Sequence, residues 1–517
     1  MDKPLNYYEQ NKEMLRFSVI ATFFWGLLAH GYHFFNSNFS HDSLKELHGA
    51  ILGNKWKVEL GRVFVPFYRD LVRSDITIPL LIGVLSLLML AMTAFLLVKI
   101  FNIDSKLLVF LTAGILTTNT TITATAATYL HDLDCYTMSI LCAVAAVYFW
   151  KRYTWGALAG ALLVMASLGM YQSYISVTIT LVMFVCILQL LDGEKFNRVF
   201  GAGMRAVGML LAGGGLYYAA MKLIQRLMGI EMAKGGYNTL DNAMTLTPAL
   251  IIDRIDDTYR DYGRWFFGAR SAYPARLVEG ITIVLLLLSG WVLIKSVVSK
   301  KMKTPEKLLC LVLVGLLPLG MNILCVLIGW NHDLTIYAIW LTYFLILLLV
   351  SRIEIVGVKV EQACRAMAFL LMAVLLYGNV QFANGLYLKK ALEHDAYLSL
   401  MTRVVYRMEN HTDYVPGETT VYFSGLADNL NDTIPGFEAY QEVTGADMID
   451  LIHIEKRERF QIFFDYVLGT PIRLVEEEKW NQLRQDPRIE AMPAYPAEGC
   501  IATVDDILVV KLGEHWE

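Results

Sequence analysis

The sequence predicts a polytopic α-helical membrane protein with about eleven transmembrane helices and a C-terminal extracytoplasmic α/β domain. Three observations support this fold class: apolar runs fill the first three quarters of the chain, a charged loop separates the first two runs, and a polar segment ends the chain. A spanning helix needs roughly 20 apolar residues, and lipid does not tolerate an exposed irregular loop. A chain that keeps a long charged loop and a polar tail is therefore expected to do more than form a pore.

The composition excludes an ordinary soluble domain, because 56% of the residues are hydrophobic and only 18% are charged. The net charge of −4 is small for 517 residues, so we expect no nucleic acid among the partners. The first residues, MDKPLNYYEQNKEMLR, precede a long apolar run and contain no small-residue cleavage site. We interpret them as a retained cytoplasmic segment rather than a signal peptide.

Lysine and arginine gather in every second connection between the apolar runs, whereas the short turns between these connections carry neither. Basic connections favour the cytoplasmic side of a membrane, which places the N-terminus inside. An odd number of spans then places the C-terminal segment outside. The predicted spans are residues 17–35, 76–98, 107–130, 134–150, 154–170, 173–191, 206–222, 277–294, 308–328, 334–351 and 366–383.

Two long loops, 36–75 and 223–276, fall on the predicted outer side. The first loop carries more basic residues than this side usually has, and nearby acidic residues offset them. Within it, Ser43-x-x-Glu46 resembles a capping box, and the second loop carries an apolar stripe with arginines beside it. We therefore expect both loops to contain interfacial helices. The basic residues of the first loop are Lys45, Lys55, Lys57, Arg62, Arg69 and Arg73.

The polar end of the chain has the mixed pattern of a small α/β domain. Segments 390–409 and 446–466 predict helices, whereas the strings TTVYFSGL and ATVDDILVVKL are typical of strands. We therefore predict two domains, a transmembrane domain over residues 1–383 and an extracytoplasmic domain over residues 384–517.

Acidic residues stand at the outer ends of several predicted spans, where charge close to hydrocarbon is costly and usually functional. Asp42 follows the first span, Asp132 and Asp134 lie in the tight turn HDLD, and Asp333 lies in the turn NHDL. All four are predicted at the outer face and are expected to converge on one cavity. Each also has a simpler interpretation, Asp42 as a helix cap and the others as solvated turn residues.

Histidines recur beside these acids, which raises the question of a metal site. His41, His131 and His332 each precede one of the aspartates, but their spacing is not that of a known ligand set. No CxxC motif supports a metal either. The sequence therefore indicates no metal and no other cofactor, while leaving a divalent ion open. It also leaves open whether Cys135 and Cys500 form a disulfide or stay two free thiols.

Arginines on the outer loops are candidates for binding the phosphate of a lipid donor, because a planar guanidinium donates to two phosphate oxygens at once. The alternative is that each arginine meets ordinary anionic headgroups. The candidates are Arg62 in the first loop and Arg254, Arg260 and Arg264 in the second.

Polar residues in the outer turns are candidates for lining the substrate cavity. The cluster around Tyr171 and Gln172 interrupts otherwise apolar sequence, although tyrosine is also common in interfacial aromatic belts. The candidates for the cavity are His131, Tyr171, Gln172, His332 and Asp333.

Several strings of the chain resemble the serotype-converting glucosyl transferases of the Gtr type II family. They are SLGMYQSYIS, the first-loop pattern HDSL…LGRVF, the turn HDLDCYTMSILCAVAAVYF and the tail segment AMPAYPAEGCIATVDDILVVKL. The resemblance implies a GT-C-like fold and an inverting glycosyltransferase on the outer face of a bacterial cytoplasmic membrane. It would move a hexose, glucose by family analogy, from undecaprenyl-phosphate hexose to a cell-surface polysaccharide such as O-antigen.

By the same resemblance, the catalytic carboxylate of the first outer loop maps onto Asp42, and an acidic motif in the next outer turn maps onto Asp132 and Asp134. The phosphate leaving group is already charged and needs cations, whereas the acceptor hydroxyl needs a base. The expected partners are the lipid-linked sugar donor, the polysaccharide acceptor, membrane lipids and a small membrane flippase that supplies the donor.

Two other classes of protein stay open from the sequence alone. A polysaccharide polymerase or ligase would share the topology and the lipid-linked substrate, although its main loop is expected later in the chain. A lipid-linked sugar transporter or flippase is the non-enzyme alternative, but the two halves of the sequence show no internal repeat.

Overall fold

The computed structural model divides into two compact units. Unit 1 comprises Met1–Phe35, Ile51–Ala126 and His131–Asn384, and unit 2 comprises Asn36–Ala50, Ala127–Leu130 and Gly385–Glu517. The structure describes residues 2–36, 40, 43, 46, 50–233, 247–267, 275–298, 302–329, 331–352, 358–425, 440, 443–445 and 457–513.

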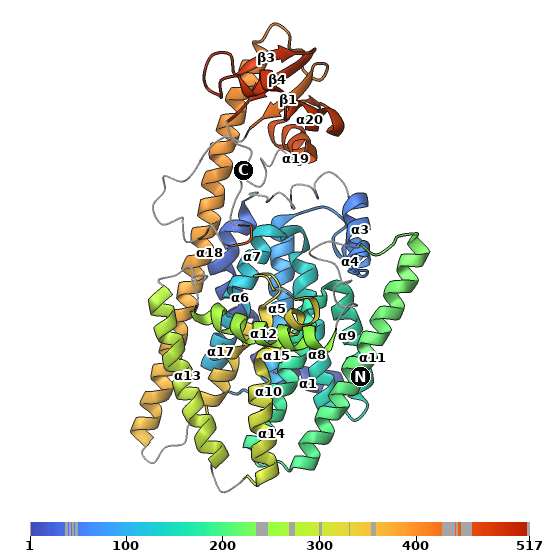
Figure 1. The fold of residues 1–517 in the computed structure, drawn as a ribbon. Helices are drawn as coiled ribbons and strands as arrows, with labels where there is room; N and C mark the ends of the chain where they lie inside the picture. Colours follow the sequence, from blue (N-terminus) through green and yellow to red (C-terminus); the bar gives the residue numbers. More distant parts are fainter. Residues whose placement is uncertain are drawn as a thin grey trace. The chain divides into compact units, whose positions relative to one another are not determined.

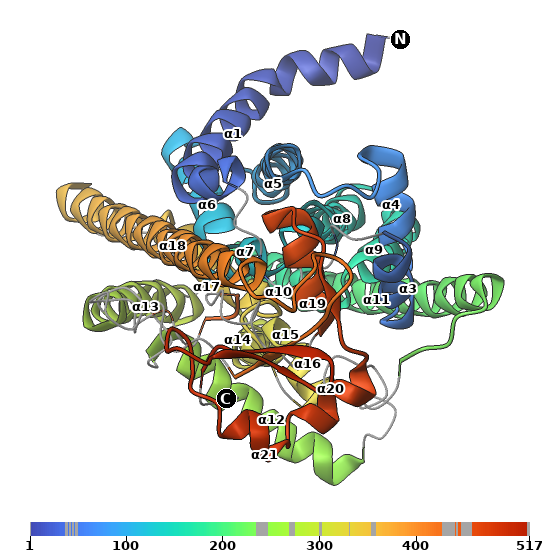
Figure 2. The same ribbon diagram turned by 90° about the horizontal axis from the view of Figure 1, so that it is seen from above.

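Helices form most of unit 1 (Figure 1). They are α1 (Asp2–Phe35), α5 (Pro79–Phe101), α6 (Lys106–Thr118), α7 (Thr120–Thr128), α8 (Leu133–Arg152), α9 (Gly156–Met170), α10 (Ile175–Leu191), α11 (Phe196–Met228), α12 (Pro248–Phe267), α13 (Ala275–Val298), α14 (Thr304–Gly315), α15 (Leu317–Met321), α16 (Ile323–Ile328), α17 (Tyr337–Val350) and α18 (Val358–Glu409). The helix α8 packs against α5 and α9, α9 packs against α11, and α1 packs against α5 and α6 (Figure 2). Both α7 and α18 continue into unit 2.

Eight helical segments among the described residues are long and apolar enough to cross a bilayer, which confirms a polytopic helical membrane protein. The predicted number of eleven spans is not confirmed and stays a prediction. The eight segments are Asn11–Phe35, Pro79–Phe101, Lys106–Thr128, Leu130–Arg152, Gln172–Leu191, Phe196–Met228, Arg276–Val298 and Gln362–Glu409.

Three predicted spans correspond to shorter helices, which accounts for the difference between eleven and eight. The predicted span 154–170 is α9, whose 15 residues extend about 22 Å, less than a hydrocarbon core of about 30 Å. The predicted span 334–351 is α17, with 14 residues. The predicted span 308–328 is divided into α14, α15 and α16. Pro318 lies in the first turn of α15, where its missing N–H costs no hydrogen bond, and Asn322 leaves the helical region with φ −126° and ψ 41°.

The helices α6 and α7 form one interrupted span that leads toward the HDLD turn. Asn119 interrupts it, because its backbone is extended with φ −65° and ψ 156°. The Asn119 amide donates to the carbonyls of Ile115 and Leu116, and its side-chain oxygen accepts from the N–H of Ile122. One side chain thus satisfies free backbone groups on both helices, which a break within a span requires.

Unit 2 contains a four-stranded sheet in the order β2-β1-β4-β3. Its strands are β1 (Thr420–Ser424), β2 (Arg473–Leu474), β3 (Ile501–Val504) and β4 (Ile507–Lys511). The strand β1 is parallel to β2 and β4, with Val421 opposite both Leu474 and Leu508, whereas β3 and β4 are antiparallel. Asp505 and Asp506 have φ values of 50° and 63°, which fit a two-residue hairpin turn of type I′. The strings TTVYFSGL and ATVDDILVVKL therefore form strands as predicted.

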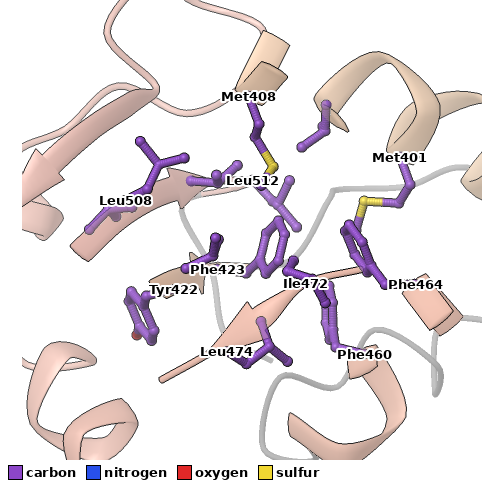
Figure 3. Packing of buried hydrophobic residues seen from close by; sticks show 14 of the residues in the cluster. Met401, Met408, Tyr422, Phe423, Phe460, Phe464, Ile472, Leu474, Leu508 and Leu512 are labelled. Carbon is purple, nitrogen blue, oxygen red and sulfur yellow. The ribbon is translucent and has the colours of Figure 1, made fainter. Parts of the chain in front are cut away.

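An aromatic core joins the sheet of unit 2 to the end of α18. Met401 and Met408 of α18 point toward Phe423 of β1 and toward Phe460 and Phe464 (Figure 3). The rings of Phe423 and Phe460 are stacked with centroids 5.0 Å apart. The short helices around this core are α19 (Arg457–Ile462), the π-helix Phe463–Leu468, α20 (Glu477–Leu483) and α21 (Pro487–Glu490).

Replacing Phe423 with alanine is expected to destabilise unit 2 by about 3–5 kcal/mol. The substitution leaves a cavity, and β1 cannot move to fill it because β1 is paired with β2 on one side and β4 on the other. Hydrogen exchange of the β4 amides in the full-length protein measures this loss. Tyr466→Ala serves as the control, since Tyr466 is an exposed aromatic residue of the same unit. Equal exchange in the two variants would contradict the position of Phe423 in the core.

Candidate functional site

The HDLD turn places three polar side chains inside unit 1. The turn consists of the 3₁₀ helix η1 (Leu130–Asp132) and the first turn of α8. The side chains of His131, Asp132 and Asp134 are all buried there. A buried carboxylate without a partner is strongly unfavourable, so this turn can fold only with cations close by.

The first loop provides two of these cations through the helix α4 (Val65–Val72). Arg69 and the C-cap residue Arg73 are four residues apart, so they lie on one face of the helix. Arg69 Nη2 donates to Asp132 Oδ1 at 2.5 Å. Arg73 binds Asp134 through Nε at 2.7 Å and through Nη2 at 3.2 Å. Two ion pairs therefore attach α4 to the turn, and their partners are separated by 63 and 61 positions in the sequence.

Arg73 uses all five of its N–H donors inside the protein. Besides its bonds to Asp134, Nη2 donates to the carbonyl of His131, and Nη1 donates to the carbonyls of Ser74 at 3.3 Å and Ile76 at 2.9 Å. Burial lowers the pKa of Arg73, but the hydrogen bond to Asp134 and the negative charge of Asp134 have the larger effect. The pKa of Arg73 is therefore raised above its ordinary value. A guanidinium with every donor occupied holds structure together and has no donor left for a substrate phosphate.

Lys57 binds the other side of the turn from α3 (Ala50–Glu59), which lies in the same loop. Its ammonium group pairs with Asp132 Oδ2 and lies 3.4 Å from His131 Nε2. Asp75 adds a further carboxylate 3.8 Å from Arg69 Nη1 and accepts a hydrogen bond of 2.7 Å from Asn54. The ion cluster, as we call it below, thus has three cations and three carboxylates: Lys57, Arg69, Arg73, Asp75, Asp132 and Asp134.

Tyr68 adds a neutral group beside the ion cluster. Its hydroxyl group donates to Met89 Sδ at 4.0 Å. The pKa of Tyr68 is raised far above its ordinary value, first by burial and then by the negative charge of Asp134. The phenol therefore stays protonated and adds no charge to the ion cluster.

The helix α4 buries an arginine and exposes several large apolar side chains. Arg69 is only 1% exposed, whereas Leu71 on the same short helix is 86% exposed, and Phe67 and Val72 are also exposed. A helix facing water has the opposite arrangement. Charges directed inward and large apolar side chains directed outward suit a lipid environment, which fits the predicted position of this loop at the membrane surface.

The turn between α3 and α4 depends on Gly61. Its φ is +79°, and a Cβ at this position would come within 2.6 Å of Tyr217 Oη and 2.9 Å of Gln172 Nε2. Gln172 donates to the carbonyl of Leu60 at 2.9 Å, and the Tyr217 hydroxyl donates to the carbonyl of Gly61 at 3.0 Å. Gln172, a predicted cavity residue from η2 (Gln172–Tyr174), thus holds the backbone of this turn.

Arg62 follows this turn and differs from Arg69 and Arg73 in being partly exposed. Its Nη1 donates to the hydroxyl of Tyr136 at 2.7 Å. Its guanidinium carbon lies 5.6 Å from the ring centroid of Tyr136 and 4.8 Å from that of Tyr171. Cation–π contacts with two rings, whose centroids are 4.3 Å apart, hold the side chain in one direction. Arg62 is therefore an oriented cation whose side chain is partly exposed.

The arginines of the second long loop contact other elements. Arg254 donates to the carbonyls of Val326 and Leu327 at the end of α16 and so satisfies free carbonyls of that helix. Exposed ion pairs within α12 hold the other two: Arg260 with Asp256, and Arg264 with Asp261. None of these contacts joins the three arginines to the ion cluster.

The structure describes only some of the remaining predicted site residues. The His332 N–H donates to the hydroxyl of Thr335, whose own hydrogen bond returns to the His332 carbonyl, so the turn before α17 is closed locally. Asp333 is buried in this turn. Asp42 and His41 lie outside the residues that the structure describes.

Four members of the ion cluster were not predicted as site residues: Asp75 and the three cations Lys57, Arg69 and Arg73. The sequence did carry a signal for the cations, because the first loop has an unusual excess of basic residues for an outer loop. The spacing of four between Arg69 and Arg73 places both on one helix face, opposite acids that need partners. Their pairing partners, however, come from a distant turn that no local pattern identifies.

Within the described parts of the chain, no group of three or more His, Cys, Asp or Glu residues is arranged to bind a metal ion. In the HDLD turn, Lys57 and Arg69 already occupy the oxygens of Asp132. Cys135 and Cys500 are buried free thiols, so the disulfide that the sequence left open is not formed.

The fold and the site define a polytopic membrane protein whose first loop is attached by buried ion pairs to an acidic turn. The model of the family described as Glucosyl transferase GtrII matches residues 31–350, more than half of the 517 residues. The chain therefore belongs to this family and is a glycosyltransferase. No curated protein and no solved structure matches it.

Arg73→Met and Asp134→Leu are each expected to lower the free energy of unfolding by about 3–5 kcal/mol, because each leaves one buried charge without its partner. The double variant should lose less free energy of unfolding than the two single variants lose together, since it removes both charges. Unfolding in mixed detergent micelles measures the cycle. Arg198→Met, which breaks an exposed pair with Glu194, is the control. Strictly additive losses would contradict a direct pair between Arg73 and Asp134.

Proposed function

We propose that the protein is an inverting glycosyltransferase that moves a hexose, glucose by family analogy, from a polyprenyl-phosphate sugar to a cell-surface polysaccharide. The single observation that carries the proposal is the family match over residues 31–350, which includes the first loop and the HDLD turn. The proposed location is the outer face of a bacterial cytoplasmic membrane, with the N-terminus inside. The exposed apolar side of α4 supports a donor that arrives from the bilayer.

In the proposed reaction, the oxygen of an acceptor hydroxyl forms a bond to the anomeric carbon while the bond from that carbon to the phosphate oxygen breaks. The polyprenyl phosphate leaves with the electron pair, and the hydroxyl proton passes to a carboxylate acting as general base. Attack on the side opposite the phosphate inverts the anomeric centre. We assign the base to Asp42, on the resemblance that the first loop bears to its family.

Asp132 and Asp134 are proposed to position the loop rather than to accept the proton. A general base needs a lone pair directed toward the substrate hydroxyl. Lys57 and Arg69 bind the oxygens of Asp132, and Arg73 binds both oxygens of Asp134. Both carboxylates are fully buried among these cations. Their negative charge therefore serves to keep α3 and α4 on the turn, which keeps the loop around Arg62 in place.

Arg62 is proposed to bind the phosphate of the donor. It is oriented by Tyr136 and Tyr171 before any ligand binds, and a preorganised cation stabilises the charge that develops on the leaving phosphate. Arg260 and Arg264 are exposed and stay candidates for a second phosphate contact, whereas the role proposed for Arg254 is to cap α16. His131 and Gln172 are proposed as supports of the site. Tyr171 orients Arg62, and His332 and Asp333 stay proposed cavity residues.

Asp42→Asn is expected to reduce sugar transfer by about 10²–10⁴-fold while leaving donor binding intact, because the amide cannot accept the proton. Transfer of radiolabel from purified undecaprenyl-phosphate glucose to cell-surface polysaccharide measures this loss. Asp70→Asn is the matched control, since Asp70 is an exposed aspartate of the same loop. Full transfer by Asp42→Asn would move the base to another carboxylate, and no transfer by the unaltered protein with a range of lipid-linked hexoses would contradict the proposed function.

Arg62→Gln is expected to lower kcat/KM for the lipid donor by about 10²-fold or more, because it removes one charged donor from the leaving phosphate. Arg62→Lys should restore only part of the loss, since an ammonium group keeps the charge but cannot donate from two nitrogens in a fixed plane. Initial rates at varied donor concentration give these constants. Arg198→Gln, at an exposed arginine of another connection, provides the comparison. Equal kinetics for Arg62→Gln and Arg198→Gln would exclude Arg62 from donor binding.

A further inference from the structure

Two distant segments of unit 2 donate hydrogen bonds to two consecutive carbonyls at the end of α7. The hydroxyl of Ser40 donates to the carbonyl of Thr128, and the hydroxyl of Ser43 donates to the same oxygen at 3.1 Å. The ammonium group of Lys390 donates to the carbonyl of Ala127, which is 263 residues away in the chain. The last carbonyls of a helix have no partner within the helix, so these side chains complete the end of α7.

Gly445 adds a contact from a fourth part of the chain. Its φ is +77°, and a Cβ on it would come within 2.1 Å of Thr128 Oγ1 and 2.9 Å of Thr128 N. Only glycine fits such a close approach in this backbone region. The residues 127–128 are therefore enclosed by the first outer loop and by two parts of the C-terminal segment, all within unit 2.

The cations of α18 at this point are buried to an unusual degree. Lys390 is fully buried, and its neighbour Lys389 is 4% exposed and pairs with Glu393 at 2.7 Å. Burying such a charge costs several kcal/mol per ion, which its contacts must offset. An apolar side chain would fill the same space without this cost. The proposed reaction described above uses neither lysine.

We propose that Lys390 is a positioning residue of the transferase: by holding the end of α7, it fixes the carbonyl that Ser40 and Ser43 bind and so fixes the first outer loop. This inference rests on the proposed function, because Asp42, the proposed base, stands between these serines in the sequence. A general base must lie within hydrogen-bond reach of its proton, and a displacement of about 1 Å costs on the order of 10²-fold in rate. The C-terminal segment is thus a working part of the transferase.

The test compares Lys390→Met, Lys390→Arg and Arg403→Met in the full-length protein, with kcat, the KM for undecaprenyl-phosphate glucose and the melting temperature measured for each. Lys390→Met should lower kcat by about 10–100-fold with the donor KM changed less than about twofold. Lys390→Arg should recover most of kcat, because a guanidinium can donate to the same carbonyl. Arg403→Met, at an exposed cation of the same helix, should match the unaltered protein.

A second variant keeps the inference testable if Lys390→Met does not fold. Ser40→Ala with Ser43→Ala removes the donors to Thr128 without adding bulk or leaving a buried charge, and it should lower kcat in the same way. An unchanged kcat in a folded Lys390→Met variant, or in the double serine variant, would overturn the inference while leaving the transferase intact. A parallel loss in kcat and melting temperature that Lys390→Arg does not repair would also overturn it. Absence of transfer by the unaltered protein would instead reject the proposed function itself.

Discussion

The pairing of α4 with the HDLD turn is the interaction on which the candidate site depends. Asp132 and Asp134 are fully buried and pair with Lys57, Arg69 and Arg73, so the burial of each charge is offset by a charge of the opposite sign. Each half of the cluster therefore requires the other. The path of the loop follows from this constraint: once α3 and α4 are held, the tight turn at Gly61 directs the next residue, Arg62, onto the rings of Tyr136 and Tyr171.

The surroundings of the cluster explain why ion pairs are used here at all. The helix α4 exposes the apolar side chains of Phe67, Leu71 and Val72. Apolar contacts are not directional, so they alone would not fix the register of the loop against the helix bundle. Directional bonds supply that register, because Arg73 can satisfy its five donors in only one position. The arrangement also separates two kinds of arginine in one loop. Arg69 and Arg73 are buried in ion pairs with the carboxylates of the cluster, whereas Arg62 is oriented and partly exposed, as the proposed contact with a lipid phosphate requires.

The sequence was sufficient to predict the polytopic helical class and the glucosyl transferase family, and it pointed to the first loop and the HDLD turn as candidate regions. These features depend on local apolar runs, on charge near the ends of spans and on motif strings. The sequence could not predict that Asp134 pairs with Arg73, because a contact across 61 residues leaves no local pattern. It also could not predict that α9 and α17 are short, or that Asn322 ends α15, because hydropathy measures composition and not backbone continuity. For the same reason the sequence could not predict that Arg254 donates to carbonyls of α16, which are more than 70 residues away.

The most direct test of this account is amide hydrogen exchange of residues 54–73 in the unaltered full-length protein reconstituted in lipid nanodiscs. Local opening of α3 and α4 would require several buried ion pairs to break at once, so their amides should exchange about as slowly as those of α8. Exchange as fast as that of an exposed surface helix, such as α12, would show that the loop lies loosely on the membrane and would contradict the ion cluster as its main constraint.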